Sequence, residues 1–153
     1  MEKVLNHLYL FKGLGDADLG KIEGIAELVT YGPGERIFSQ GDAADAFYLI
    51  QSGAVRIDLL EEDDTEVEIA KLGTGSHFGE MGMLDKEPRS ASATSESYTD
   101  VIRISYDDIS ALMDADNKIA IHFYREISRF LASRLRLTSL DLSLSRSQNL
   151  SYF

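Results

Sequence analysis

Residues 37–53 read IFSQGDAADAFYLIQSG, and this stretch decides the fold. Gly41 and Gly53 stand where tight turns require a positive φ, a conformation that glycine adopts without steric cost. Between the two glycines, residues 47–50 are a short, continuous apolar run that reads as a buried strand. The segment therefore predicts one strand held between two turns.

Short apolar or alternating runs continue on both sides of this segment, from Val29 to Ile104. Turn signals rich in glycine, proline or acidic residues separate the runs, at 32–34, 41–42, 52–53, 62–64, 73–75 and 86–88. Many short strands at near-regular spacing are typical of a closed or sandwiched antiparallel sheet. We interpret the acidic turn at 61–64 as a solvated hairpin tip.

Helical periodicity brackets the strands and divides one domain, 1–153, into three parts. Residues 1–28 predict two short helices, the second capped by Asp16. Residues 29–104 form the β-region, and 105–148 form C-terminal helices, with a candidate cap at Ser105. A long helix is expected from about Asn117 towards residue 145, with its apolar positions at Phe123, Ile127, Leu131, Leu135 and Leu142. Thr138 interrupts this stripe, so we expect it on the buried face of the helix.

Composition narrows the class of protein. The chain has 153 residues, no cysteine, 44% hydrophobic residues and a formal net charge of −11, which opposes nucleic-acid binding. It contains no apolar run long enough to cross a membrane and no signal-peptide pattern, so we expect a soluble, cytoplasmic protein. Five arginines interleave with apolar helix positions and are interpreted as solvated flanks of a buried stripe: Arg125, Arg129, Arg134, Arg136 and Arg146.

The run FGEMGMLDKEPRSA at 78–91 places a carboxylate, Glu80, and a guanidinium, Arg89, nine positions apart across a short helical turn. Arginine matches phosphate geometry, and N–H groups at a helix start add donors for the same anion. Glu80 is left free to accept hydrogen bonds from sugar hydroxyls. The alternative is an ordinary surface ion pair between the two residues. His77, just before the run, is interpreted as an exposed loop residue.

This run resembles the phosphate-binding cassette of the cyclic-nucleotide-binding domain family, and residues 37–53 resemble the family's other signature. The resemblance includes the ligand-binding half of catabolite activator proteins and the regulatory subunits of cAMP-dependent protein kinase. It implies a mainly β fold, an antiparallel barrel or jelly roll (a cupin-like double-stranded β-helix), with N-terminal helices and a long C-terminal helix. It also implies ligand contacts from Phe78, Gly79, Glu80, Met81, Arg89, Ser90 and Ala91.

In the family's activator branch, a Thr-Ser pair on the long helix grips adenine, and Thr138-Ser139 resembles that pair. The resemblance implies that Thr138 bonds the base from its own chain and Ser139 from a partner chain. The alternative is a bond from the Thr138 hydroxyl to the carbonyl of residue 134 within the helix. The apolar positions near the far end of the helix require another chain, so we expect a homodimer through this helix.

The resulting expectation is a non-catalytic regulatory module that binds a 3′,5′-cyclic nucleotide, with cAMP as first choice and cGMP as a second possibility. Its signal would be a movement of the C-terminal helices. The alternative is a degenerate member that serves as a ligand-free dimerisation module. No catalytic set and no metal site are expected from the spacing of the histidines and carboxylates. The printed sequence ends at Phe153 without a helix-turn-helix, so direct DNA binding is not expected, although a longer regulator stays open.

Overall fold

The computed structural model describes residue 5 and residues 8–150, with residues 143–150 described by their backbone alone. Its elements are, in chain order, α2 (Asp16–Glu23), β1 (Ala26–Tyr31), β2 (Arg36–Phe38), β3 (Ala46–Ser52), β4 (Val55–Leu60), β5 (Glu66–Leu72), β6 (His77–Phe78), α3 (Met81–Asp85), β7 (Ser92–Ser95), β8 (Thr99–Ser105), α4 (Tyr106–Ala115) and α5 (Asn117–Leu150). No described helix has both the length and the apolarity that a membrane span needs.

The strands form two four-stranded antiparallel sheets, ordered β1-β8-β3-β6 and β2-β7-β4-β5. This is the mainly β, jelly-roll-like architecture that the sequence predicted, with helices at both ends of the chain. The β4–β5 hairpin turns through the acidic residues 61–64, as expected. Gly41 and Gly53 have φ of 88° and 101°, which confirms the positive φ predicted for both turns.

β3 separates two hydrophobic cores, which explains its continuous apolar sequence. Tyr48 and Ile50 pack between the two sheets, with Val55, Phe78 and Val101. Phe47 and Leu49 belong to a second core, formed with residues of the N-terminal segment, α2, α4 and the first part of α5. The rings of Phe47 and Phe123 lie 5.6 Å apart in this second core. Both faces of the strand are therefore buried.

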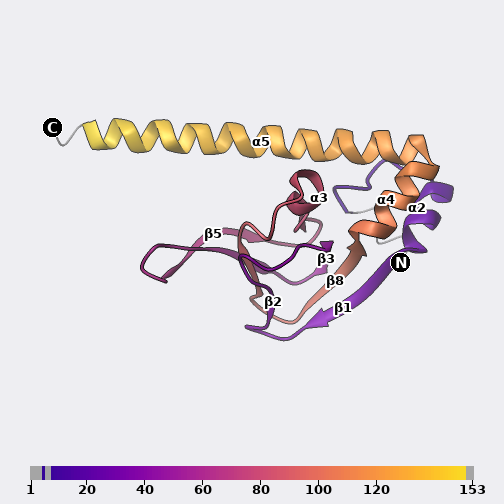
Figure 1. Ribbon diagram of the computed structural model, residues 1–153, viewed down its shortest axis with the longest axis horizontal. Helices are drawn as coiled ribbons and strands as arrows, with labels where there is room; N and C mark the ends of the chain where they lie inside the picture. Colours follow the sequence, from indigo (N-terminus) through magenta and orange to yellow (C-terminus); the bar gives the residue numbers. More distant parts are fainter. Residues whose placement is uncertain (1–4, 6–7, 151–153) are drawn as a thin grey trace.

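α5 lies along the barrel and above α3, while α2 and α4 gather near its N-terminal end (Figure 1). Its 34 residues correspond to a length of about 51 Å at 1.5 Å per residue. Phe123 and Ile127 are buried, and Leu131 packs against the helical core. Leu135, Leu137, Leu140 and Leu142 are exposed, so the apolar stripe continues past the part that the barrel covers.

Two local predictions differ from the structure and one is confirmed. Asp16 is the first residue of α2 and Gly15 is its N-cap, which makes no side-chain capping bond. Residues 26–28, expected in the N-terminal helices, begin β1, because Ala26 pairs with Ile104 of β8 and the strand continues in register. Ser105 caps α4 as predicted, accepting a hydrogen bond from the Asp108 N–H at 3.1 Å.

Candidate functional site

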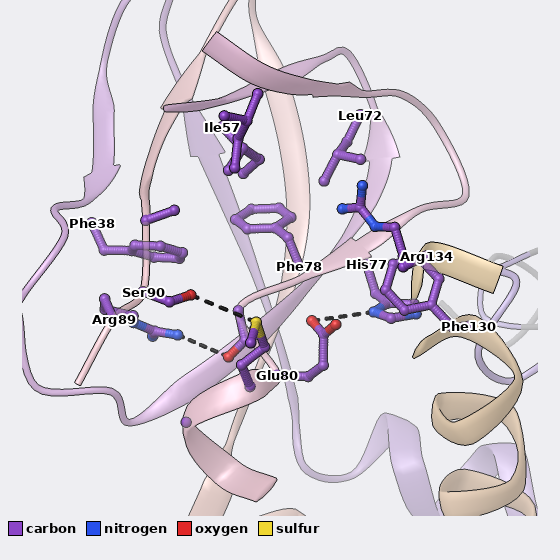
Figure 2. A pocket seen from close by; sticks show the side chains of 15 residues that line it. Phe38, Ile57, Leu72, His77, Phe78, Glu80, Arg89, Ser90, Phe130 and Arg134 are labelled. Atoms are coloured by element: carbon purple, nitrogen blue, oxygen red, sulfur yellow. Dashed lines mark hydrogen bonds and ion pairs between the residues drawn. The ribbon is translucent and has the colours of Figure 1, made fainter. Parts of the chain in front are cut away.

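A pocket opens where the end of the barrel, α3 and α5 meet (Figure 2). Seven of the predicted contact residues line it: Phe78, Gly79, Glu80, Met81, Arg89, Ser90 and Ala91. The structure adds lining residues from other elements: Phe38, Ile57, Ile69, Leu72, His77, Gly82, Phe130 and Arg134. The pocket is thus an apolar cleft with a few charged groups at its edges, the usual character of a small-ligand site.

Gly79 shapes the wall between the two charged residues of the cassette. Its φ is 83°, and a Cβ at this position would lie 2.9 Å from Arg89 Nη1 and 3.3 Å from the ring of Phe38. Both the conformation and the space therefore require glycine. The turn lets the Gly79 carbonyl accept hydrogen bonds from Arg89 Nη1 at 2.8 Å and from the Tyr106 hydroxyl.

Arg89 is buried, with 6% of its surface exposed, and the backbone of the barrel holds it. Its Nη2 donates to the carbonyl of Ala46 at 2.8 Å, and its guanidinium carbon lies 4.0 Å from the centre of the Phe38 ring. Asp45, an exposed carboxylate, lies 3.5 Å away. The Nε–H is buried without a partner among the described residues. A buried positive charge with an unused donor is suited to an anion.

Glu80 is equally buried, with 4% of its surface exposed, and its carboxylate points towards His77 (Figure 2). Glu80 Oε2 lies 3.3 Å from His77 Nδ1, within ion-pair distance although not in good hydrogen-bond geometry. Burial alone would raise the pKa of Glu80, but His77, the residue's own backbone N–H and the charge of Arg134 together lower that pKa below its ordinary value. Glu80 is therefore an ionised acceptor at neutral pH.

The expectation for His77 was wrong. The residue is the first of β6 and only 4% exposed, because β6 pairs with β3 at Leu49 and α5 covers its side chain. Its ring centre lies 4.3 Å from that of Phe130, a residue of α5. Glu80 is consequently not a free acceptor: it already has a neighbour from the barrel wall.

Arg134 is exposed, as expected for a flank of the helix stripe, but it has a second role that was not predicted. Its side chain is exposed, but it lines the pocket and its guanidinium carbon lies 5.2 Å from the centre of the Phe130 ring. The pattern of the helix gave no signal for this role, because the residues that it faces belong to β6 and the cassette. Only the docking of α5 on the barrel brings them together.

The surface ion pair considered for Glu80 and Arg89 is not what these residues form, because both are buried and each faces other groups. Thr138 and Ser139, expected at the ligand, are exposed on α5 and lie outside the residues that line the pocket. Thr138 was expected on the buried face. α5 has already left the helical core after Leu131, which explains the difference.

Comparison with known proteins places these features in a family. Residues 28–116 match the family described as cyclic nucleotide-binding domain. A type II regulatory subunit of cAMP-dependent protein kinase from Drosophila melanogaster is 36% identical over 110 residues, 72% of this chain and 28% of that protein. A cyclic AMP receptor protein from Thermus thermophilus is 35% identical over 135 residues, 88% of this chain and 61% of that protein.

Solved structures agree with this assignment. The catabolite activator protein of Thermus thermophilus superposes with a TM-score of 0.78 at 34% identity, covering 89% of this chain and 62% of that one. A cyclic nucleotide-binding domain from Methylobacillus flagellatus superposes with a TM-score of 0.78 at 25% identity, covering 88% of this chain and 75% of that one. This chain spans less than two thirds of the length of both curated relatives. Because the family match covers more than half of its residues, the chain belongs to the cyclic nucleotide-binding domain family.

Proposed function

We propose that this protein is a non-catalytic regulatory module that binds a 3′,5′-cyclic nucleotide, with cAMP as the first choice. One observation carries the proposal: a buried arginine and a buried glutamate line the same pocket from opposite ends of one cassette. A cyclic nucleotide presents an anionic phosphate and a ribose hydroxyl at neighbouring positions. The two side chains offer a cation for the first and an acceptor for the second.

In this proposal Arg89 binds the exocyclic phosphate oxygens and Glu80 accepts from the ribose 2′-hydroxyl. The unpartnered Nε–H of Arg89 supports the first role, since an acceptor there would satisfy a buried donor. The lowered pKa of Glu80 supports the second, since the carboxylate can accept at neutral pH. Ser90 and Ala91 line the pocket beside Arg89 and complete the phosphate end.

The choice of cAMP rests on relatives that this chain resembles, whose names include a cyclic AMP receptor protein and a cAMP-dependent kinase subunit. Ser90 leaves cGMP as the second candidate. We further propose that the base is contacted by Thr138 of one chain and Ser139 of a second chain. The exposed leucines of α5 support a homodimer through this helix, because Leu135 and Leu137 are 68% and 61% exposed on a single chain.

Signalling in this proposal is a population shift of α5. Phe130 and Arg134 of α5 line the pocket together with Glu80 and Arg89 of the cassette. A ligand in the pocket therefore touches both the barrel and the helix, and it favours whichever position of the helix gives it better contacts. Because cyclic nucleotides are intracellular messengers, the proposal also places the protein in the cytoplasm.

Calorimetric titration of the wild-type protein with cAMP, cGMP and 5′-AMP tests the function. We expect saturable heat with cAMP, weaker binding of cGMP, and no measurable binding of 5′-AMP, which lacks the cyclic phosphodiester. Absence of heat with both cyclic nucleotides at millimolar concentration would leave the ligand-free dimerisation module as the better account.

Sedimentation at micromolar protein concentration tests the proposed homodimer. We expect a dimer of the 17.0 kDa chain, and a Leu135→Lys and Leu137→Lys double variant is expected to sediment as a monomer, because charged side chains at these exposed positions disfavour an apolar contact. A monomer for the wild-type protein with and without cAMP would contradict the dimer.

A further inference from the structure

His77 occupies a place between the ligand pocket and α5 that its sequence position did not suggest. The pairing of β6 with β3 at Leu49 fixes its backbone, and Phe130 covers its ring from α5. Its Nδ1 faces Glu80 Oε2 at 3.3 Å (Figure 2). The imidazole is therefore buried between β6 and α5, with Nδ1 facing the carboxylate.

We propose that His77 is a positioning residue for Glu80, and that a proton on its imidazole makes nucleotide binding stronger at acidic than at alkaline pH. The inference rests on the proposed function of the pocket. It goes further because it gives His77, which contacts neither the phosphate nor the ribose in that proposal, a proton-dependent effect on affinity.

The positioning follows from the chemistry of Nδ1. Without a proton, Nδ1 presents a lone pair to the lone pairs of Oε2, and the two groups repel each other. With a proton, Nδ1 donates towards Oε2 and holds the carboxylate in one orientation. A carboxylate has two oxygens, so one oxygen can face His77 while the other receives the ligand hydroxyl.

The sign of the pH effect follows from charge. A cyclic phosphodiester keeps its negative charge throughout the neutral range and brings that charge into the pocket. An imidazolium beside the pocket attracts it, and an uncharged imidazole does not. Protonation of His77 and binding of the nucleotide therefore favour each other, and the complex takes up part of a proton when it forms.

The other charged groups around His77 do not supply this effect. A second cavity that His77 also lines has Tyr9, Glu126 and Arg129 in its wall, and Arg134 lies beside Phe130. Glu126 and Arg129 already pair with each other at 2.6 Å. None of these neighbouring side chains ordinarily changes charge between about pH 5 and 8, whereas the imidazole of His77 belongs to the one side-chain type that does.

The affinity for cAMP, measured by calorimetry between about pH 6 and 8 in two buffers of different ionisation enthalpy, tests the proposal. We expect wild-type affinity to fall about three- to tenfold from the acidic to the alkaline end, with proton uptake on binding. His77→Gln can still donate to Glu80 but does not titrate, so its affinity should be independent of pH. His122→Gln is the matched control, because His122 Nε2 contacts the Leu10 carbonyl at 3.1 Å and does not line the ligand pocket.

A wild-type slope that survives in His77→Gln, or a wild-type affinity that is flat across this range, would overturn the inference while the proposed function stands. A wild-type protein that binds no nucleotide at any pH would instead contradict the proposed function. A measurement without any variant checks the positioning directly: a long-range ¹H–¹⁵N spectrum of the wild-type protein should show a proton on His77 Nδ1. An Nδ1 without a proton at about pH 6 would overturn the positioning role.

Discussion

The two ends of the pocket are built in different ways. At the Arg89 end, the guanidinium is fixed by carbonyl oxygens of Gly79 and Ala46 and by the ring of Phe38. At the Glu80 end, the carboxylate faces a side chain of β6, and that side chain is covered in turn by Phe130 of α5. The first end is held by the barrel, the cassette and Tyr106 of α4, and the groups that hold it include no residue of α5. The second depends on where the long helix lies.

This difference suggests a division of roles within one site. A guanidinium held by backbone groups keeps its position whether or not α5 moves, so it suits a constant anchor for phosphate. A carboxylate whose neighbours include α5 changes its surroundings when the helix shifts. The Arg89 end should therefore set affinity, and the Glu80 end should connect ligand binding to the helix.

Arg89→Lys should give the largest effect. Lysine cannot reproduce the planar fork, so we expect cAMP affinity to fall by about tenfold to hundredfold or more, the loss of a charge-assisted contact of about 1.5–3 kcal/mol. Stability should fall as well, because the carbonyls of Gly79 and Ala46 lose buried donors. Calorimetry and thermal unfolding measure the two effects. Arg36→Lys is the control, since Arg36 forms an exposed pair with Glu66 at 2.8 Å; an equal loss of affinity in both variants would mean that Arg89 is no special anchor.

Glu80→Gln should weaken cAMP binding by about tenfold, because the amide keeps the shape but loses the charge that strengthens the bond to a hydroxyl. The variant should also change the acid stability. Since folding lowers the pKa of Glu80, the ionised carboxylate stabilises the fold above its ordinary pKa, and this contribution disappears as pH falls through the lowered value.

Unfolding of the wild-type protein and Glu80→Gln across the acidic range measures this contribution. The free energies of unfolding should differ most near neutrality and converge in acid. Glu66→Gln, at an exposed pair, serves as the control. A constant difference between wild type and Glu80→Gln at every pH would show that the carboxylate gains nothing from its surroundings.

Lys86→Gly should give the smallest effect and separate stability from binding. Lys86 ends α3 with φ of 62°, a left-handed conformation that costs a non-glycine residue about 1 kcal/mol. We expect glycine to stabilise the protein by about 0.5–1 kcal/mol without changing cAMP affinity, because the lysine is exposed and does not line the pocket. Lys86→Ala should give no such gain, and a stabilised Lys86→Ala would argue against the backbone explanation.

The sequence, with its resemblance to a known family, was sufficient to predict the barrel and to place Gly79 and Arg89 at one pocket. The cassette is contiguous, so Gly79 and Arg89 are brought together by one short turn and helix. The strands could be recognised because β3 is apolar on both faces and its flanking turns contain Gly41 and Gly53. Local pattern and local structure coincide at these positions.

The Glu80 end could not be predicted in the same way. His77 was taken for a loop residue because nothing in its own neighbourhood shows that α5 covers it. Arg134 follows the polar side of a helix pattern, and its place at the pocket depends on the docking of that helix. Thr138 looked buried because the apolar stripe continues through it, but the helix is exposed from residue 132 to residue 142.

A co-crystal structure of the protein with cAMP tests the central claim most directly. We predict one nucleotide per chain in the pocket between the cassette and α5, with an exocyclic phosphate oxygen within hydrogen-bond distance of the Arg89 guanidinium and the ribose 2′-hydroxyl at the Glu80 carboxylate. A nucleotide bound elsewhere on the chain, or an empty pocket in crystals grown at millimolar cAMP, would contradict the account.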